Sequence, residues 1–304
     1  MRRRPGAVLN NSSFVFILGI VVGLAAGGGA SWTEPALVPV LAVVMTISLL
    51  DVSPRVLLDA RKMLFPVVAG LVLSYAVLGG LYIGLSSLFI DDADLRAGFV
   101  LVAACPQAVS VIPVTFLLGG NLRFTLAGAV ATYIAALALA PLICVLFIGS
   151  SAIEPTRLLV VLGELIVAPM IAAQILRRTR IVATVNRWRS PVVNWGFFFV
   201  IYTVIGLNSE LILQEPRTLL AVSALAFLGV FVLGELINRA FGLMGVAKAD
   251  RISLMLLGTR KNEGMAGAIA LVLFSTTAAL PAAVHLAVSI VNFAFLTWRV
   301  KRMR

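Results

Sequence analysis

Histidine, cysteine and acidic residues are scarce in this chain of 304 residues. It contains one histidine, His285, two cysteines, and 13 aspartate and glutamate residues. A single histidine argues against a histidine metal site or a Ser-His-Asp triad. Cys105 and Cys144 both fall in apolar stretches, where the expected role is packing rather than a disulfide or a metal site. We therefore expect no enzyme, no cofactor and no metal centre.

Charged residues of either sign are also few. They make up 12% of the chain, against 61% apolar residues and a mean hydropathy of +1.07. This composition excludes a soluble domain, and the continuous apolar runs exclude an outer-membrane barrel, whose strands alternate apolar and polar residues. The sequence predicts an all-α polytopic membrane protein. The expected spans number ten and cover about residues 13–28, 35–50, 64–90, 95–118, 122–148, 156–176, 190–212, 217–242, 249–274 and 277–298.

The net charge of +11 is distributed unevenly along the chain. With a cytoplasmic N-terminus, the external segments carry most acidic residues and only three basic ones, Arg96, Arg157 and Arg217. The positive-inside rule then predicts a multi-pass protein of the cell inner membrane with both termini cytoplasmic. Nucleic acid is not an expected partner. The basic residues of the inside segments are Arg2 to Arg4, Arg55, Arg61, Lys62, Arg123, Arg177, Arg178, Arg180, Arg187, Arg189, Arg239, Lys248, Arg251, Arg299, Lys301, Arg302 and Arg304.

One charged segment remains at membrane depth. Residues 258–264 read Gly-Thr-Arg-Lys-Asn-Glu-Gly and lie inside the expected ninth span. Ionisable groups at this depth are costly and indicate a functional site. The glycines at both ends, Gly258 and Gly264, indicate that the helix is interrupted. The candidate binding residues here are Thr259, Arg260, Lys261, Asn262 and Glu263.

A second interruption is predicted in the fourth span. Pro106 and Pro113 each remove a backbone donor, so nearby carbonyl groups lose their helical partners. Gln107, Ser110 and Thr115 add hydrogen-bonding side chains to the same stretch. Freed backbone groups at this depth need protein, water or an ion. This interruption could instead be an ordinary kink, as proline often produces in membrane helices.

The two interruptions occupy the same place in two halves of the chain. Residues 1–150 and 151–304 each hold five expected spans, and each half is interrupted in its fourth span. Because five is odd, the second half must be inverted relative to the first, which predicts an inverted repeat. If the fourth and ninth helices cross at mid-membrane, their half-helix ends can bind an anion or a cation.

Other polar residues at membrane depth are weaker candidates. Glu164, His285, Asn292 and Asn194 could line a cavity or relay a proton. His285 and Asn292 are seven residues apart and share a helix face, where packing is the simpler role. Arg260, Lys261 and Glu263 could likewise form a structural ion-pair network that only fixes the helix crossing.

These features resemble the bile acid:sodium symporter superfamily over essentially the whole chain. The resemblance rests on Cys105-Pro106 at the fourth-helix break, Leu-Leu-Gly-Gly-Asn121, Ala140-Pro141-Leu142 and the polar break in the ninth helix. It implies a panel of helices 1, 2, 6 and 7, and a core of helices 3–5 and 8–10 that moves against it. It also implies organic anions as substrates, with sodium as the usual coupling ion.

The sodium ligands of that family do not carry over. The positions of its fourth-helix Ser-Asn pair fall on Val111 and Ile112, and its fifth-helix hydroxyls fall on or near Ala136 and Leu137. Its ninth-helix Glu falls on Leu256 and its Gln on Arg260. Sodium needs oxygen ligands, as other hard cations do, and an arginine would repel it. We therefore expect that the usual two sodium sites are absent.

We predict instead that Arg260 and Lys261 act as fixed positive charges for a small carboxylate-like anion. Glu263 would neutralise one of them. Burial disfavours a charged lysine, so Lys261 could release a proton and couple transport to protons or to exchange. The alternatives are a sodium-coupled symporter and a non-transporting membrane receptor. Neither a channel nor an enzyme fits the pattern, and no obligate protein partner is inferred.

Overall fold

The structure is a computed structural model that describes residues 12–51, 60–149 and 154–302. Within these ranges every regular element is a helix. In the first half the α-helices are α2 (Ser12–Ala25), α3 (Ala30–Thr33), α4 (Leu37–Ser48), α5 (Ala60–Leu71), α6 (Gly80–Phe89), α7 (Ala93–Ala104), α8 (Val111–Leu118) and α9 (Leu122–Phe147). Short 3₁₀ turns η1 (Gly27–Gly29), η2 (Glu34–Ala36) and η3 (Leu49–Asp51) flank α3 and α4.

The second half contains α10 (Pro155–Leu162), α11 (Ala168–Leu176), α12 (Val182–Leu207), α13 (Ser209–Gln214), α14 (Pro216–Phe227), α15 (Leu233–Leu243), α16 (Lys248–Leu257), α17 (Glu263–Leu273) and α18 (Thr276–Arg302). Three long helices contain a stretch of π-helix, namely η5 (Val72–Gly79), η6 (Gly163–Val167) and η7 (Leu228–Val232). Stretches of this kind are often found at functional sites.

The all-helical membrane class predicted from the composition is confirmed for the described residues. Seven of their helices are long and apolar enough to cross a membrane. They are Gly27–Ser48, Met63–Phe89, Leu122–Phe147, Thr156–Leu176, Val182–Leu207, Pro216–Leu243 and Thr276–Val300. The other expected spans are the short helix α2 and the two interrupted pairs, α7 with α8 and α16 with α17.

Both interruptions are shorter than the sequence suggested. The first covers residues 105–110, because α8 already begins at Val111. Pro113 therefore lies in the first turn of α8, where a missing N–H costs nothing. The second covers residues 258–262, so Glu263 and Gly264 open α17 instead of belonging to the break.

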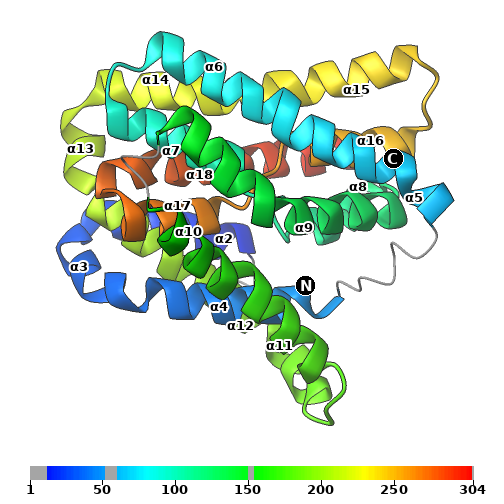
Figure 1. Cartoon of the computed structure of the whole chain (residues 1–304), viewed down its shortest axis with the longest axis horizontal. Coiled ribbons are helices and arrows are strands. Elements are labelled where there is room, and N and C mark those ends of the chain that lie inside the picture. Colours follow the sequence, from blue (N-terminus) through cyan, green and yellow to red (C-terminus); the bar gives the residue numbers. More distant parts are fainter. Residues whose placement is uncertain (1–11, 52–59, 150–153, 303–304) are drawn as a thin grey trace.

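The helices pack in two groups. Helices α2, α4 and α11 pack against α12 or against each other. In the other group α5 packs against α9, α7 against α18, and α17 against α18. Figure 1 shows α3, α4, α11 and α12 in its lower part and α6, α14 and α15 in its upper part. Gly70 and Gly128 let α5 and α9 approach closely, since a Cβ on Gly70 would lie 2.8 Å from the Gly128 Cα.

Acidic and basic segments lie at opposite ends of the molecule. In Figure 1 the ends near α3 and α13 are at the left, whereas the link from α15 to α16 and the C-terminal end are at the right. The left-hand elements carry Glu34 and Glu210, and the right-hand ones carry Lys248 and Arg302. Arg2 to Arg4, Arg55 and Arg304 lie outside the described residues.

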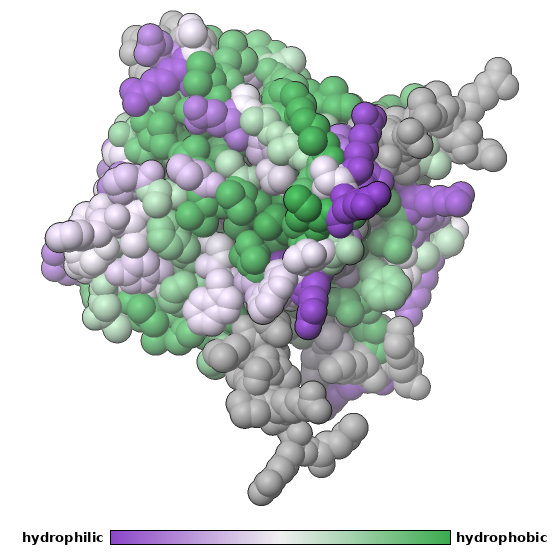
Figure 2. Space-filling view, turned by 90° about the horizontal axis from the view of Figure 1, so that it is seen from below, coloured by the Kyte–Doolittle hydropathy of each residue, from purple (hydrophilic) through white to green (hydrophobic). Residues whose placement is uncertain are grey.

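The surface between these ends is largely apolar. Figure 2 shows one face with hydrophobic residues over its centre and hydrophilic residues gathered towards its edges. Such a band suits the hydrocarbon region of a bilayer, which is about 30 Å thick.

Candidate functional site

The two helix interruptions lie against each other and satisfy each other's backbone. The Asn262 N–H donates a hydrogen bond of 2.9 Å to the Pro106 carbonyl, and the Gln107 side-chain amide donates to the Leu257 carbonyl. Each break thus supplies a hydrogen-bond donor to a backbone carbonyl that the other break leaves without a helical partner. At membrane depth such groups must find partners within the protein, which explains why the two breaks occur together.

Lys261 is fully buried at this crossing. Its Nζ donates to the carbonyls of Ala103, at 2.8 Å, and of Cys105, at 2.9 Å. These carbonyls belong to the C-terminal end of α7, which carries the negative end of the helix dipole. The ammonium also lies 4.4 Å from the centroid of the Tyr75 ring, a cation–π contact. No carboxylate among the described residues pairs with it.

Arg260 turns in the opposite direction, towards α18. Its Nη1 donates to the Ser289 carbonyl at 2.8 Å, and its Nη2 donates to Asn292 Oδ1 at 2.6 Å. Only Nε is left without a partner. Both guanidinium ends are therefore engaged with protein, so a bidentate contact with a carboxylate would require Arg260 to leave α18.

Glu263 pairs with His285 instead of with either cation. Its Oε1 lies 2.9 Å from His285 Nδ1 and accepts a hydrogen bond of 3.0 Å from Ser289 Oγ. The His285 ring packs edge-on against Tyr82, with ring centroids 5.4 Å apart. Its Nε2 is buried without a partner.

Asn262 caps α17 and ties it to two other helices. Its Oδ1 accepts from the Met265 N–H at 3.2 Å, as an N-cap does. Its Nδ2 lies 3.3 Å from the Tyr133 hydroxyl on α9 and 3.3 Å from Met45 Sδ on α4. Thr259 makes only a local bond, from Oγ1 to the Met255 carbonyl at 2.8 Å.

The candidate residues in and after the first break differ in burial. Gln107 is fully buried at the crossing, and its N–H donates to Thr132 Oγ1 at 3.2 Å while its Oε1 has no partner. Thr115 is buried further along α8, where it bonds Thr125 Oγ1 at 3.1 Å. Ser110 is exposed and does not reach the crossing.

The break-forming residues act through the backbone. Pro106 offers its carbonyl to Asn262, and Gly258 caps the end of α16. Gly264 lies where a Cβ would press on Leu41 and Phe197, at 3.3 and 3.4 Å. This glycine therefore lets α17 approach α4 and α12.

Two other candidates lie away from the crossing. Glu164 is exposed in the π-helical stretch η6. Asn194 is buried on α12, where it accepts from Ser12 Oγ at 2.8 Å and donates to Ser190 Oγ. His285, in contrast, contacts Glu263, and Asn292 contacts Arg260.

Sequence reasoning missed Ser289, Tyr75 and Tyr133. Ser289 lies between His285 and Asn292 on one helix face, so its spacing from them was a usable signal. Nothing in the sequence connects Tyr75 on η5 with Lys261, because only the folded structure brings the two elements together.

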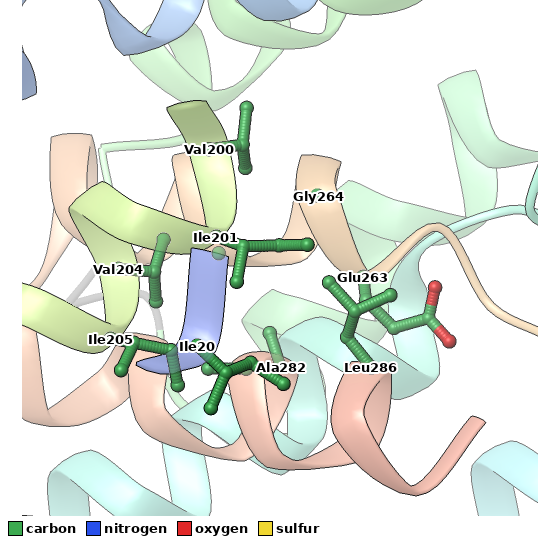
Figure 3. Close-up of a pocket in the computed structure, with 11 residues that line it drawn as sticks. Ile20, Val200, Ile201, Val204, Ile205, Glu263, Gly264, Ala282 and Leu286 are labelled. Atoms are coloured by element: carbon green, nitrogen blue, oxygen red, sulfur yellow. The ribbon is translucent and has the colours of Figure 1, made fainter. Parts of the chain in front are cut away.

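A small apolar recess adjoins the crossing. It is lined by Glu263 and Gly264 on α17 and by side chains from α2, α12 and α18. Figure 3 shows the Glu263 carboxylate at one end of a lining of Ile20, Ile201, Val204 and Leu286. Its free space is about 10 Å³, room for about one water molecule. The protein is closed around the crossing in this conformation.

The crossing offers two fixed cations and hydrogen-bonding groups, but few oxygens for a metal ion. Among the described residues no three His, Cys, Asp or Glu side chains are grouped to hold a metal. Val111 and Leu256 supply no side-chain oxygen, and the carbonyls of Ala103 and Cys105 already bind Lys261. The carbonyls of Ala103 and Cys105 are therefore not free for sodium, a hard cation that needs oxygen ligands, whereas Gln107 Oε1 at the crossing has no partner.

Comparison with known proteins identifies the kind of chain to which this geometry belongs. The model of the Sodium Bile acid symporter family matches residues 38–215, more than half of the chain. The chain is 25% identical over 246 residues to the Probable sodium/metabolite cotransporter BASS1, chloroplastic, of Arabidopsis thaliana. That match covers 78% of this chain and 60% of the relative.

A second relative is the Uncharacterized sodium-dependent transporter YocS of Bacillus subtilis, 24% identical over 223 residues. That match covers 72% of this chain and 68% of the relative. Both relatives are named as transporters, not enzymes.

Proposed function

The chain belongs to the Sodium Bile acid symporter family, and from this premise we propose that it is a secondary active transporter of a small organic anion. It would work by alternating access, without the two sodium sites usual in the family. Its own cations at the crossing, Lys261 and Arg260, would take the place of bound sodium.

The observation that carries this proposal is the position of the Lys261 ammonium. Carbonyl oxygens at a helix end are good ligands for a cation, because they combine lone pairs with the negative end of the helix dipole. At the end of α7 those oxygens, on Ala103 and Cys105, already bind Nζ at 2.8 and 2.9 Å. A sodium ion would have to displace a fully buried lysine to use them.

The charge at the crossing supports an anionic substrate. Arg260 and Lys261 contribute two positive charges and Glu263 one negative charge, which leaves +1 when His285 is neutral. All three side chains are at most 7% exposed, so water screens the excess charge weakly. An anion that enters next to the crossing would therefore be attracted. A carboxylate carries one negative charge, which matches the net charge of +1 at the crossing.

The transport mechanism would use a ten-helix inverted repeat with crossed fourth and ninth helices. Two features at corresponding places in residues 1–150 and 151–304 favour it. The third expected span contains η5 and the eighth contains η7, and the fourth and ninth are interrupted. The packing of α2, α4, α11 and α12 among themselves suits a panel against which the remaining helices move.

We also propose that the protein lies in the cell inner membrane with both termini cytoplasmic. The support is the separation of acidic and basic segments to opposite ends of the helices, as the positive-inside rule requires. Arg178, Lys248 and Arg302 would then face the cytoplasm, and Glu34 and Glu210 the opposite side.

Sodium-coupled symport is the second candidate. It is favoured by the names of both relatives, a sodium/metabolite cotransporter and a sodium-dependent transporter. It would require sodium ligands that differ from those at the α7 end, since Lys261 holds the carbonyls there.

Uptake into proteoliposomes tests the two candidates. Purified protein is supplied with radiolabelled mono- and dicarboxylates under an inward sodium gradient, an inward proton gradient, or neither. We expect at least one carboxylate to be taken up equally with and without sodium, and faster with the proton gradient. Uptake that needs sodium and ignores protons would contradict the proposal. Lys261→Gln should abolish uptake, while Lys248→Gln, an exposed lysine at the start of α16, should not.

A further inference from the structure

We propose that Glu263, held by His285 and Ser289, is the group that takes up and releases the coupling proton. This inference rests on the proposed function, since it names the proton site of that carrier. Lys261 was the residue that the sequence favoured for this role. The geometry favours the carboxylate for three reasons, which concern its hydrogen bonds, its histidine partner and the recess beside it.

The hydrogen bonds of Glu263 involve only one of its two carboxylate oxygens. Both contacts, His285 Nδ1 at 2.9 Å and Ser289 Oγ at 3.0 Å, are to Oε1. Within the described residues Oε2 has no hydrogen-bond partner. A proton can therefore bind Oε2 without breaking either existing contact. Lys261 differs, because its ammonium is held by two carbonyls and a ring, and loss of its proton would weaken all three contacts.

The His285 ring has a hydrogen-bond partner at only one of its two nitrogens. Its Nδ1 faces Glu263, so a neutral ring with the hydrogen on Nδ1 donates to Oε1. A second proton would have to reside on Nε2, which is buried and has no acceptor. A buried donor without an acceptor is unfavourable. We therefore place the extra proton on Glu263.

Glu263 also adjoins a recess with room for about one water molecule, which Lys261 does not line. It lines the recess between α2 and α12 on one side and α17 and α18 on the other. These helices come from the two packing groups, so relative movement of the groups would open or close the recess. Lys261 is 0% exposed and does not line it.

The surrounding charges explain how a proton and an anion would be coupled. With Glu263 ionised the crossing carries +1, and with Glu263 protonated it carries +2. The higher charge binds an anion more strongly, and by linkage the anion strengthens proton binding. A proton taken up from water on one side of the membrane would bind Oε2 and return to water on the other side, so a monocarboxylate and one proton would move together without net charge. The other ionisable groups that face the pair are Arg260, Lys261, Cys105, Tyr82 on α6 and Tyr133 on α9.

Infrared difference spectroscopy can test this assignment without any substrate, so its result does not depend on whether transport is found. The full chain is reconstituted in liposomes and the pH is stepped between about 5 and about 8, the range in which a proton-coupled carrier must titrate. We expect the carbonyl band of a protonated buried carboxyl group to appear at low pH. This band should be absent in Glu263→Gln. It should remain in Glu154→Gln, which changes an exposed carboxylate outside the site.

Ser289→Ala keeps the test decisive if Glu263→Gln does not fold. The variant removes a hydroxyl that donates to Oε1, so the frequency of the carbonyl band should shift. A wild-type spectrum with no such band, or a band that neither substitution alters, would overturn the proposal.

Discussion

At the scale of single residues, Lys261 is held by groups from two other elements. Its ammonium binds two carbonyls at the end of α7 and lies over Tyr75 on η5. A buried charge is costly unless it is hydrogen-bonded, and here all of the compensation comes from neutral groups. The lysine therefore stabilises the crossing of the helices as well as supplying its charge.

Replacement of Lys261 by methionine should expose this role. The apolar side chain cannot donate, so the Ala103 and Cys105 carbonyls lose their partner, and each buried group left unsatisfied costs about 1–3 kcal/mol. We expect the unfolding temperature of the purified protein to fall by several degrees. Lys248→Met, on the exposed start of α16, should change it by less than about one degree. Equal unfolding temperatures for the two variants would contradict the structural role.

The sequence identified the charged residues of the site but not their pairing. Arg260, Lys261 and Glu263 were recognisable because ionisable groups are rare at bilayer depth. The partner of Glu263 was not, because His285 lies 22 residues away on α18 and only folding brings it within 2.9 Å. For the same reason Ser289 went unnoticed.

At the scale of elements, the N-caps of α7 and α17 offer a matched pair. Asp92 accepts from the Leu95 N–H at 2.8 Å, and Asn262 accepts from the Met265 N–H at 3.2 Å. Both side chains accept the same kind of backbone hydrogen bond, but only the Asn262 side chain also contacts other helices, through Nδ2 to Tyr133 and Met45. A comparison of the two can therefore separate helix stability from function.

Alanine at either cap should destabilise the protein by a similar amount, about 0.5–2 kcal/mol. Asn262→Ala also removes the side-chain contact with Tyr133, so we expect it to slow uptake of an identified anion at least tenfold. Asp92→Ala should leave uptake within about twofold. The prediction is checked by urea or thermal unfolding together with initial uptake rates. It fails if the two variants transport equally well.

The interrupted helices were predictable from the sequence because proline and glycine leave a clear local signal. Pro106 and Gly258 mark where α7 and α16 end, within a residue or two. The π-helical stretches left no such signal. Residues 72–79 read as an ordinary apolar run, although η5 contains Tyr75, the ring that covers Lys261.

At the scale of the whole molecule, the separation of charge fixes the expected orientation. Arg178 follows α11 at the basic end, and Glu154 precedes α10 at the opposite end of the same span. Both side chains are exposed, whereas Cys105 and Cys144 are each 1% exposed and should not react with reagents in water.

Single cysteines can therefore report the orientation. In intact cells a membrane-impermeant thiol reagent should label Glu154→Cys, while Arg178→Cys should react only after the cells are permeabilised. The reverse pattern would place the basic end outside and reject cytoplasmic termini. The unsubstituted protein, whose cysteines are buried, is the control for background labelling.

If the Lys261 ammonium replaces bound sodium, sodium should not stabilise the folded protein, and a sodium titration of the unfolding temperature measures this. A ligand that binds only the folded protein stabilises it by about 2.7 kcal/mol at one hundred times its dissociation constant. Purified protein is heated at constant ionic strength while sodium replaces choline. We expect an unfolding temperature that does not change with sodium. A saturable increase that sodium produces and potassium does not would contradict it.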